Sequence, residues 1–139
     1  MPNTLQQTLI TIEAAMIAVH AAIEEGHRLG VPVSAAIVDP SLTLVAFGKA
    51  DGATPHSVDT SRAKANTAAS TRRPTGWMGN DLAIPIPLAT SGRLTNIRGG
   101  APIAIDAVVV GAIGVAGGTP EQDETIAAAV IERLATPQA

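Results

Sequence analysis

The sequence predicts an α+β domain in which an antiparallel sheet is flanked by helices. Two pairs of β-branched segments, each indicating a hairpin, are separated by a helical segment, and helices with broad apolar stripes precede and follow them. Hairpins separated by helices are typical of α+β domains. The 139 residues have the size of one domain, with no internal repeat or linker, so one domain is expected over residues 1–139.

The first helix is expected to begin near residue 4 and to end at Gly30. Its apolar residues recur at alternating spacings of four and three, the period of a helical stripe. Thr4 or Asn3 can cap the start, and Gly30 can adopt the left-handed conformation that ends a helix. The stripe predicted to be buried consists of Leu5, Leu9, Ile12, Met16, Val19 and Ile23.

The first hairpin is predicted from strands in residues 31–39 and 42–47. Thr54 and Pro55 then fit the start of a second helix that reaches Arg73. Its buried face is predicted to be small, which lets a helix lie close to a sheet. That face consists of Ser57, Ser61, Ala65, Ala68 and Ala69.

Residues 74–100 are the least regular part, and they are expected to contain a short helix or strand and to act as a lid or pocket wall. A second hairpin is predicted from residues 101–105 and 108–116. The last helix is predicted to start at Thr119-Pro120-Glu121-Gln122, a capping box with proline at the first helical position. Its buried stripe would be Ile126, Ala127, Val130, Ile131 and Leu134.

Composition limits the class of protein. The absence of cysteine excludes a disulfide framework, thiolate zinc sites and a cysteine nucleophile. No apolar run reaches the roughly 18–20 residues of a membrane span, and the acidic, amphipathic residues 1–30 do not resemble a secretory signal. We therefore expect a soluble, cytoplasmic protein without membrane partners. Charged residues are only 15%, so a homo-oligomer would help to cover the apolar surface.

The net charge of −3 is unevenly distributed. Residues 49–98 carry a net charge of +4, whereas the segments before and after them are acidic. With one Trp, one Phe and no Tyr, the chain lacks the stacking rings or broad basic face that nucleic acids require. The basic middle instead favours a small anionic ligand.

Three groups of segments form recognisable motifs. They are Val33–Asp39, Leu44–Phe47 and Asp51–Ala53, then Ser57–Ala68, and then Gly100–Ile103 and Val110–Asp123. These segments resemble the signatures of the GlcG/HbpS family, which includes the C-terminal domain of PduO. The resemblance extends from about residue 10 to 134, and the last motif is quite specific.

The resemblance implies a profilin-like α/β/α arrangement around a five-stranded antiparallel sheet, usually assembled into oligomers. Several family members bind haem, and some are linked to haem sensing or corrinoid metabolism. Others belong to pathways of small organic acid catabolism, and hydrolytic activity is attributed to one branch. The family therefore does not fix one activity.

Two turns depart from the family pattern. The family usually has glycine where Leu42 stands, and Asp-Gly where this chain has Asp106-Ala107. A non-glycine residue at positive φ costs about 1 kcal/mol. This cost favours another turn type at both positions.

The first candidate site is on the first helix. His20, Glu24 and His27 are spaced to share one face and could hold a divalent metal, or His20 could be an axial haem ligand. The alternative is a solvated polar face. Haem pockets tend to be lined with aromatic residues, and this chain offers only Phe47 and Trp77, which argues against haem.

The second candidate is basic. Lys64 held near Asp51, with Arg62 and Thr67 on the same helix, could orient a substrate anion or take part in proton transfer. The alternative is an ion pair that anchors the second helix to the hairpin. Ser57, like Ser61 and Thr67, is not a convincing nucleophile.

The third candidate is the glycine-rich end of the last strand. Backbone N–H groups of Gly117 and Gly118 could donate to a carboxylate or an oxyanion, although these glycines also suit a tight turn. Glu121 and Asp123 are not spaced as a matched acid–base pair, and first-turn carboxylates usually serve as caps. The arginines around the irregular stretch could clamp a carboxylate or lie on the surface; they are Arg72, Arg73, Arg93 and Arg98.

Two functions remain open. The leading hypothesis is binding of haem or a related tetrapyrrole. The other is an enzyme of hydrolase or proton-transfer type that acts on a small carboxylated metabolite, with Lys64 and Asp51 as catalytic groups. The pocket hypothesis requires the second helix and the last strand to meet, so that the Lys64 ammonium lies near the peptide donors of Gly117 and Gly118. A structural or regulatory oligomer without a ligand is the third possibility.

Overall fold

The computed structural model describes residues 2–135. Along the described chain, the helices and strands follow one another in the predicted order, with two short helices in the irregular stretch. The elements are α1 (Ile12–Arg28), β1 (Ser34–Val38), β2 (Leu44–Lys49), α2 (Ser57–Thr71), α3 (Asn80–Ala83), α4 (Ile86–Ala89), β3 (Gly100–Ile105), β4 (Val108–Ala116) and α5 (Pro120–Ala135).

The strands form an antiparallel sheet in the order β2-β1-β4-β3. The prediction of an antiparallel sheet flanked by helices is confirmed, but within residues 2–135 the sheet has four strands, not five. The two hairpins supply all four. The irregular stretch contains Pro74, Pro85 and Pro87, which cannot donate to a sheet ladder, and it forms α3 and α4 instead of a fifth strand.

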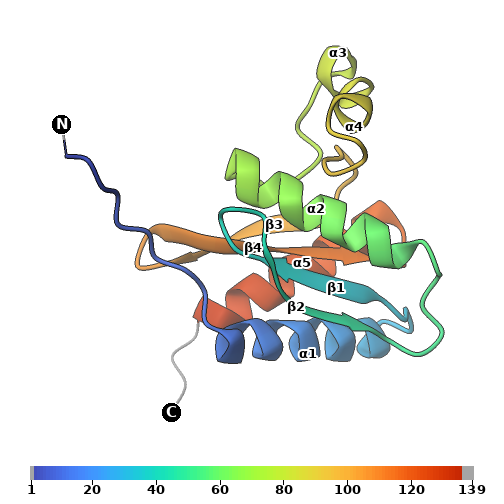
Figure 1. Ribbon diagram of the computed structural model, residues 1–139. Coiled ribbons are helices and arrows are strands. Elements are labelled where there is room, and N and C mark those ends of the chain that lie inside the picture. Colours follow the sequence, from blue (N-terminus) through green and yellow to red (C-terminus); the bar gives the residue numbers. More distant parts are fainter. Residues whose placement is uncertain (1, 136–139) are drawn as a thin grey trace.

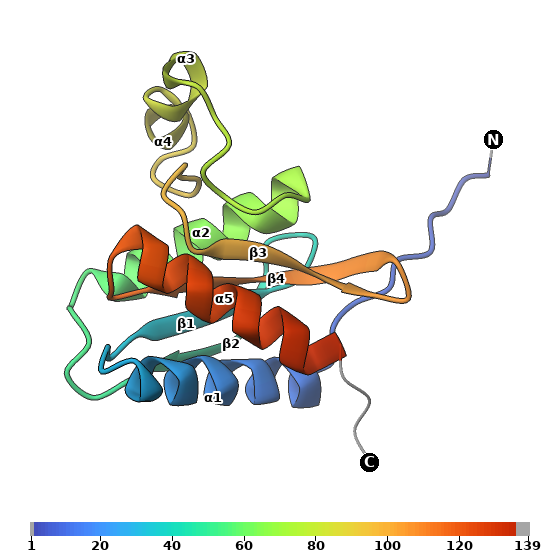
Figure 2. The ribbon, with the colours of Figure 1, turned by 180° about the vertical axis from the view of Figure 1, so that it is seen from behind.

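Helices cover both faces of the sheet (Figures 1 and 2). α1 and α5 lie side by side on one face, over the larger apolar core. α2 covers the other face, and the short helices α3 and α4 project beyond α2, away from the sheet. None of the helices in the described part of the chain is long and apolar enough to cross a membrane.

α2 lies unusually close to the sheet. A Cβ atom added to Gly114 on β4 would collide with the Ser61 carbonyl oxygen of α2. Since no side chain separates the two backbones there, the contact requires small residues on both elements. The predicted small buried face of α2 is confirmed, together with the small sheet residues Ala36 and Ala112 that pack against it.

α1 differs from its prediction in start and in orientation. It begins at Ile12 with Thr11 as its cap, while residues 2–11 form an extended arm whose Ile10 N–H donates to the Val110 carbonyl. The arm leaves Leu5 90% exposed. The buried stripe of α1, which packs on the sheet and α5, is mostly alanine. Of the six residues predicted to form that stripe, only Val19 is fully buried and Ile23 is half-buried.

The other helix boundaries agree better. α2 begins at Ser57 after His56, and no side chain caps it, so the predicted start, with Thr54 as cap and Pro55 as first helical residue, is two residues too early. α5 begins as predicted, because the Thr119 hydroxyl accepts from the Gln122 N–H and the Gln122 side chain accepts from the Thr119 N–H. Just after α1, Gly30 has the predicted left-handed conformation, with a φ of 74°.

Both unusual turns keep the left-handed conformation that glycine normally provides. Leu42 has a φ of 67°, and Asp106 and Ala107 have φ values of 51° and 64°. The prediction of another turn type is therefore wrong. At Asp106-Ala107, a two-residue hairpin loop with positive φ at both positions matches the twist of its strands, and this advantage outweighs the local cost.

Candidate functional site

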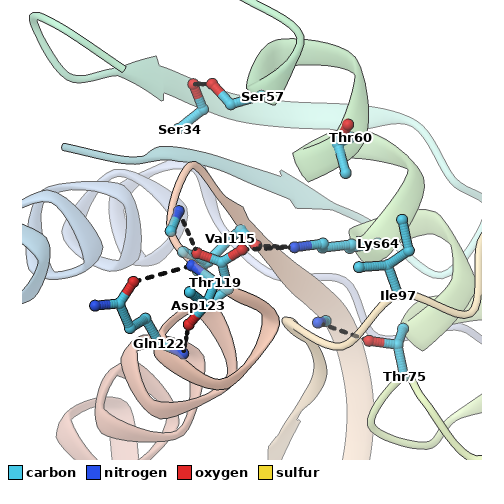
Figure 3. A network of polar contacts seen from close by, with 12 residues as sticks. Ser34, Ser57, Thr60, Lys64, Thr75, Ile97, Val115, Thr119, Gln122 and Asp123 are labelled. Atoms are coloured by element: carbon cyan, nitrogen blue, oxygen red, sulfur yellow. Dashed lines mark hydrogen bonds and ion pairs between the residues drawn. The ribbon is translucent and has the colours of Figure 1, made fainter. Parts of the chain in front are cut away.

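A buried ion pair joins α2 to the β4–α5 turn (Figure 3). The Lys64 ammonium donates to Asp123 Oδ2 and to the Val115 carbonyl, each at 2.8 Å. The other carboxylate oxygen of Asp123 accepts from the Gly118 N–H at 2.9 Å. Both charged side chains are only 2% exposed.

This geometry brings together Lys64 and Gly118, two of the three groups that the pocket hypothesis named, but it places a carboxylate between them. The Lys64 ammonium and the Gly118 N–H lie near each other because both donate to Asp123. An anionic ligand would have to displace that carboxylate. The cluster therefore fastens α2 to the β4–α5 turn.

Burial also affects the protonation of this lysine. Removal from water lowers the pKa of Lys64 below 10.5, because burial disfavours the charged form. The hydrogen bond and the charge of Asp123 oppose this shift.

Asp51 does not belong to this cluster. It lies exposed in the turn after β2, and the partner of Lys64 is Asp123 instead. Asp123 was predicted only as a helix-capping carboxylate. One signal could have pointed to it: Lys64, which was not included in the predicted buried face of α2, lies three residues after Ser61 and four before Ala68 of that face, and a buried lysine needs an acidic partner.

Thr67 has a structural position. Its hydroxyl donates to the Ala63 carbonyl at 2.7 Å and accepts from the Thr95 N–H at 2.8 Å. It is fully buried and attaches the segment after α4 to α2. Ser57 is equally enclosed, with its hydroxyl in contact with that of Ser34 at 2.8 Å (Figure 3).

The four arginines around the irregular stretch do not form one clamp. Arg73 stacks on the Trp77 ring at 4.0 Å, and Arg98 lies 3.8 Å from Glu121. Arg72 ends α2 in a left-handed conformation. Arg93 and Arg62 are instead among the residues that line a hollow beside α2.

His20 lies on the outer, exposed face of α1. Met16 and Ile17, one helical turn before it, are 50% and 44% exposed, so the imidazole adjoins an aliphatic surface. Glu24 pairs with Arg133 of α5 at 2.9 Å. Among the described residues no group of three His, Asp or Glu side chains is arranged to hold a metal ion.

The fold and these clusters define an α+β protein whose antiparallel sheet carries two helices on one face and one closely packed helix on the other. Residues 10–132 match the family model described as haem degrading protein HbpS-like. The chain belongs to this HbpS-like family, as its resemblance indicated.

Relatives with known names support the assignment. Protein GlcG of Escherichia coli K12 is 32% identical over 115 residues, covering 78% of this chain and 82% of GlcG. A double mutant of HbpS from Streptomyces reticuli has a crystal structure with a TM-score of 0.85 and 34% identity, covering 96% of this chain and 92% of that one. The crystal structure of a PduOC:haem complex has a TM-score of 0.82 and 25% identity, covering 90% of this chain and 94% of that one.

Proposed function

We propose that this protein binds haem or a related tetrapyrrole, with His20 as an axial ligand. The observation that carries the proposal is the position of His20, exposed on α1 beside the half-exposed Met16 and Ile17. Imidazole is a common axial ligand of haem iron, and aliphatic side chains suit the face of a macrocycle. The family description and the haem complex of PduOC support the same ligand class.

The residues of one chain fit part of such a site. α1 supplies a ligand and an aliphatic platform, but Phe47 lies on β2 and Trp77 beneath Arg73, so neither aromatic side chain belongs to this helix. A second copy of the chain would cover the exposed side of the macrocycle. We therefore include self-association in the proposal, while a cytoplasmic location stays a prediction.

The enzyme alternative has weaker support. Its lysine is buried and paired with Asp123, and its second catalytic group, Asp51, is not the partner of that lysine. A substrate would need to break a buried ion pair before reaching Lys64.

Titration with hemin tests the proposal. We expect a Soret band that saturates near one equivalent and an apparent Kd that rises about tenfold or more in His20→Ala, because loss of a ligand worth 1.4 kcal/mol has this effect. His27 is a further exposed histidine of α1, so His27→Ala is the matched control. This variant should bind hemin like the wild type. Identical titrations for all three proteins would reject His20 as the ligand, and unsaturable adsorption would reject the binding function.

A further inference from the structure

The short helices α3 and α4 form a lobe, residues 79–94, that carries an apolar tip. The lobe projects beyond α2, away from the sheet (Figures 1 and 2). The tip, residues 82–89, has the sequence Leu-Ala-Ile-Pro-Ile-Pro-Leu-Ala and carries no charge. Its Leu88 and Ile84 are 83% and 67% exposed, and among the large apolar side chains that the structure describes only Leu5 is more exposed than Leu88. An apolar surface of this kind indicates a contact with another surface.

The base of the lobe is fixed by hydrogen bonds from both of its chain segments. Asn96 Oδ1 accepts from the Met78 N–H at 2.9 Å, which joins the two segments to each other. The Thr67 hydroxyl of α2 accepts from the Thr95 N–H at 2.8 Å, which joins the lobe to α2. Because the support is already ordered, a contact through the tip loses less conformational entropy than a contact through a flexible loop.

A complementary surface lies at the end of the sheet, between the arm and the β3–β4 hairpin. It is an open hollow of about 250 Å³, which we call the hairpin hollow. Its large apolar lining residues are Leu9, Ile10, Ile105, Val108 and Val110. Leu9, Ile105 and Val108 are each between 46% and 48% exposed, and Asp106 is the one charged residue in the lining. A concave apolar surface suits a convex apolar group, as the cores of protein interfaces show.

The tip and the hairpin hollow of one chain lie apart. In both ribbon views the lobe stands beyond α2, whereas the β3–β4 hairpin lies at the far end of the sheet (Figures 1 and 2). The charges favour contact between copies, because the tip belongs to residues 49–98, with a net charge of +4, and the hollow is formed by the acidic segments before and after them. Segments of opposite net charge attract, whereas two tips or two hollows bring like charges together.

We propose that the tip of one copy inserts Leu88 into the hairpin hollow of a second copy. The two copies use different surfaces, so the contact is heterologous, and each added copy still offers a tip or a hollow to the next. Such a contact closes into a ring when the rotation between neighbouring copies divides a full turn. It includes neither His20 nor Met16, so it goes beyond the proposed haem binding and is tested in haem-free protein.

Two variants that each damage one surface test the proposal. Leu88→Lys places a charge on the tip and Ile105→Lys places one in the hollow; both side chains are exposed, so both variants should fold. Size-exclusion chromatography with light scattering at about 100 μM should give each variant alone a lower mass than the wild type. The equimolar mixture should form a complex of two chains, because the intact hollow of Leu88→Lys takes the intact tip of Ile105→Lys.

The outcomes of this experiment separate the alternatives. A mixture with a mass no higher than that of the separate variants, or Leu88→Lys with the mass of the wild type, would overturn the proposal. Val58→Lys adds the same charge at an exposed apolar position of α2 and should keep the mass of the wild type. If Val58→Lys lowers the mass as much as the other two variants do, the effect is one of net charge and the assignment of the two surfaces is wrong.

Cross-linking locates the contact. The sequence contains no cysteine, so single cysteines can be introduced without competing thiols. Leu88→Cys mixed with Val108→Cys and oxidised should give a disulfide-linked pair with one chain of each variant, whereas Leu88→Cys mixed with Val58→Cys should not. A disulfide between two Leu88→Cys chains in the same yield would show a contact between two tips and would overturn the proposal.

Sedimentation with phosphatidylserine vesicles tests a lipid surface as the other occupant of the tip. We expect the wild type to stay in the supernatant. Wild-type protein that sediments with the vesicles, together with Leu88→Lys that does not, would assign the tip to a membrane surface and overturn the proposal.

Discussion

Lys64 and Asp123 show how a single buried charge can depend on one partner. Both side chains are almost fully buried. In addition to their ion pair, Lys64 donates to the Val115 carbonyl and Asp123 accepts from the Gly118 N–H. Burying two charges carries a large desolvation cost, which their attraction and their remaining hydrogen bonds offset. The pair is therefore sensitive to the loss of one member.

Lys64→Met should destabilise the protein by about 3–5 kcal/mol, because it leaves the Asp123 carboxylate buried without its cation. Urea unfolding followed by circular dichroism measures the change in the free energy of unfolding. The double variant Lys64→Met/Asp123→Leu is the control, and it should be closer in stability to the wild type than the single variant is. A single variant that loses less than about 1 kcal/mol would show that the pair is not needed.

For single residues, the sequence predicts which side chains are buried better than it predicts which polar side chains contact each other. It predicts the small buried face of α2 but does not include Lys64 in it, and it suggests Asp51 as the partner of Lys64, since both match family signatures. Asp123 lies 59 positions away and is brought to Lys64 by sheet pairing. The burial of Asn66 and its hydrogen bond to the Arg93 carbonyl give no signal in the sequence, because both depend on where the loop after α4 lies.

At the scale of elements, the contact between α2 and β4 is the tightest constraint. Gly114→Ala should lower stability by about 1–3 kcal/mol or more, because its Cβ meets the Ser61 carbonyl and the backbones must separate. Thermal or urea unfolding measures the loss. Gly79→Ala is the matched control: Gly79 has an ordinary φ of −72°, and its Cβ would meet only the mobile end of Asp81. Equal stability of the two variants would contradict the close packing.

Element boundaries were predictable where a local signal was unique. The capping box at Thr119 and Gln122 fixes the start of α5, because no competing cap stands nearby. Both Thr4 and Thr11 could cap α1, and the apolar spacing continues through both. In the structure Thr11 is the cap, because Ile10 is hydrogen-bonded to Val110 near the start of β4. A helix that started at residue 4 would lose this contact.

At the scale of the whole molecule, apolar side chains remain exposed at one end of the sheet. Leu9 of the arm lies with Ile105 and Val108 of the β3–β4 hairpin around a shared hollow, and Leu5 extends beyond them. A cluster of this kind is typical of interaction surfaces. We predict that a second copy of the chain covers this cluster.

Ile105→Lys should shift the protein toward lower mass in size-exclusion chromatography with light scattering, because it places a charge in the apolar cluster. Val58→Lys introduces the same charge at an exposed apolar position of α2 and should leave the mass unchanged. A wild-type protein that is monomeric at about 100 μM would contradict the assembly, since stable interfaces bind more tightly than this.

The position of the iron tests the central claim most directly. Crystals grown with hemin would give an anomalous difference peak at the iron absorption edge. The account predicts that this peak lies within bonding distance of the His20 imidazole, over the aliphatic side chains of α1. A peak bonded to another residue, or ordered crystals of the saturated protein without a peak, would contradict it.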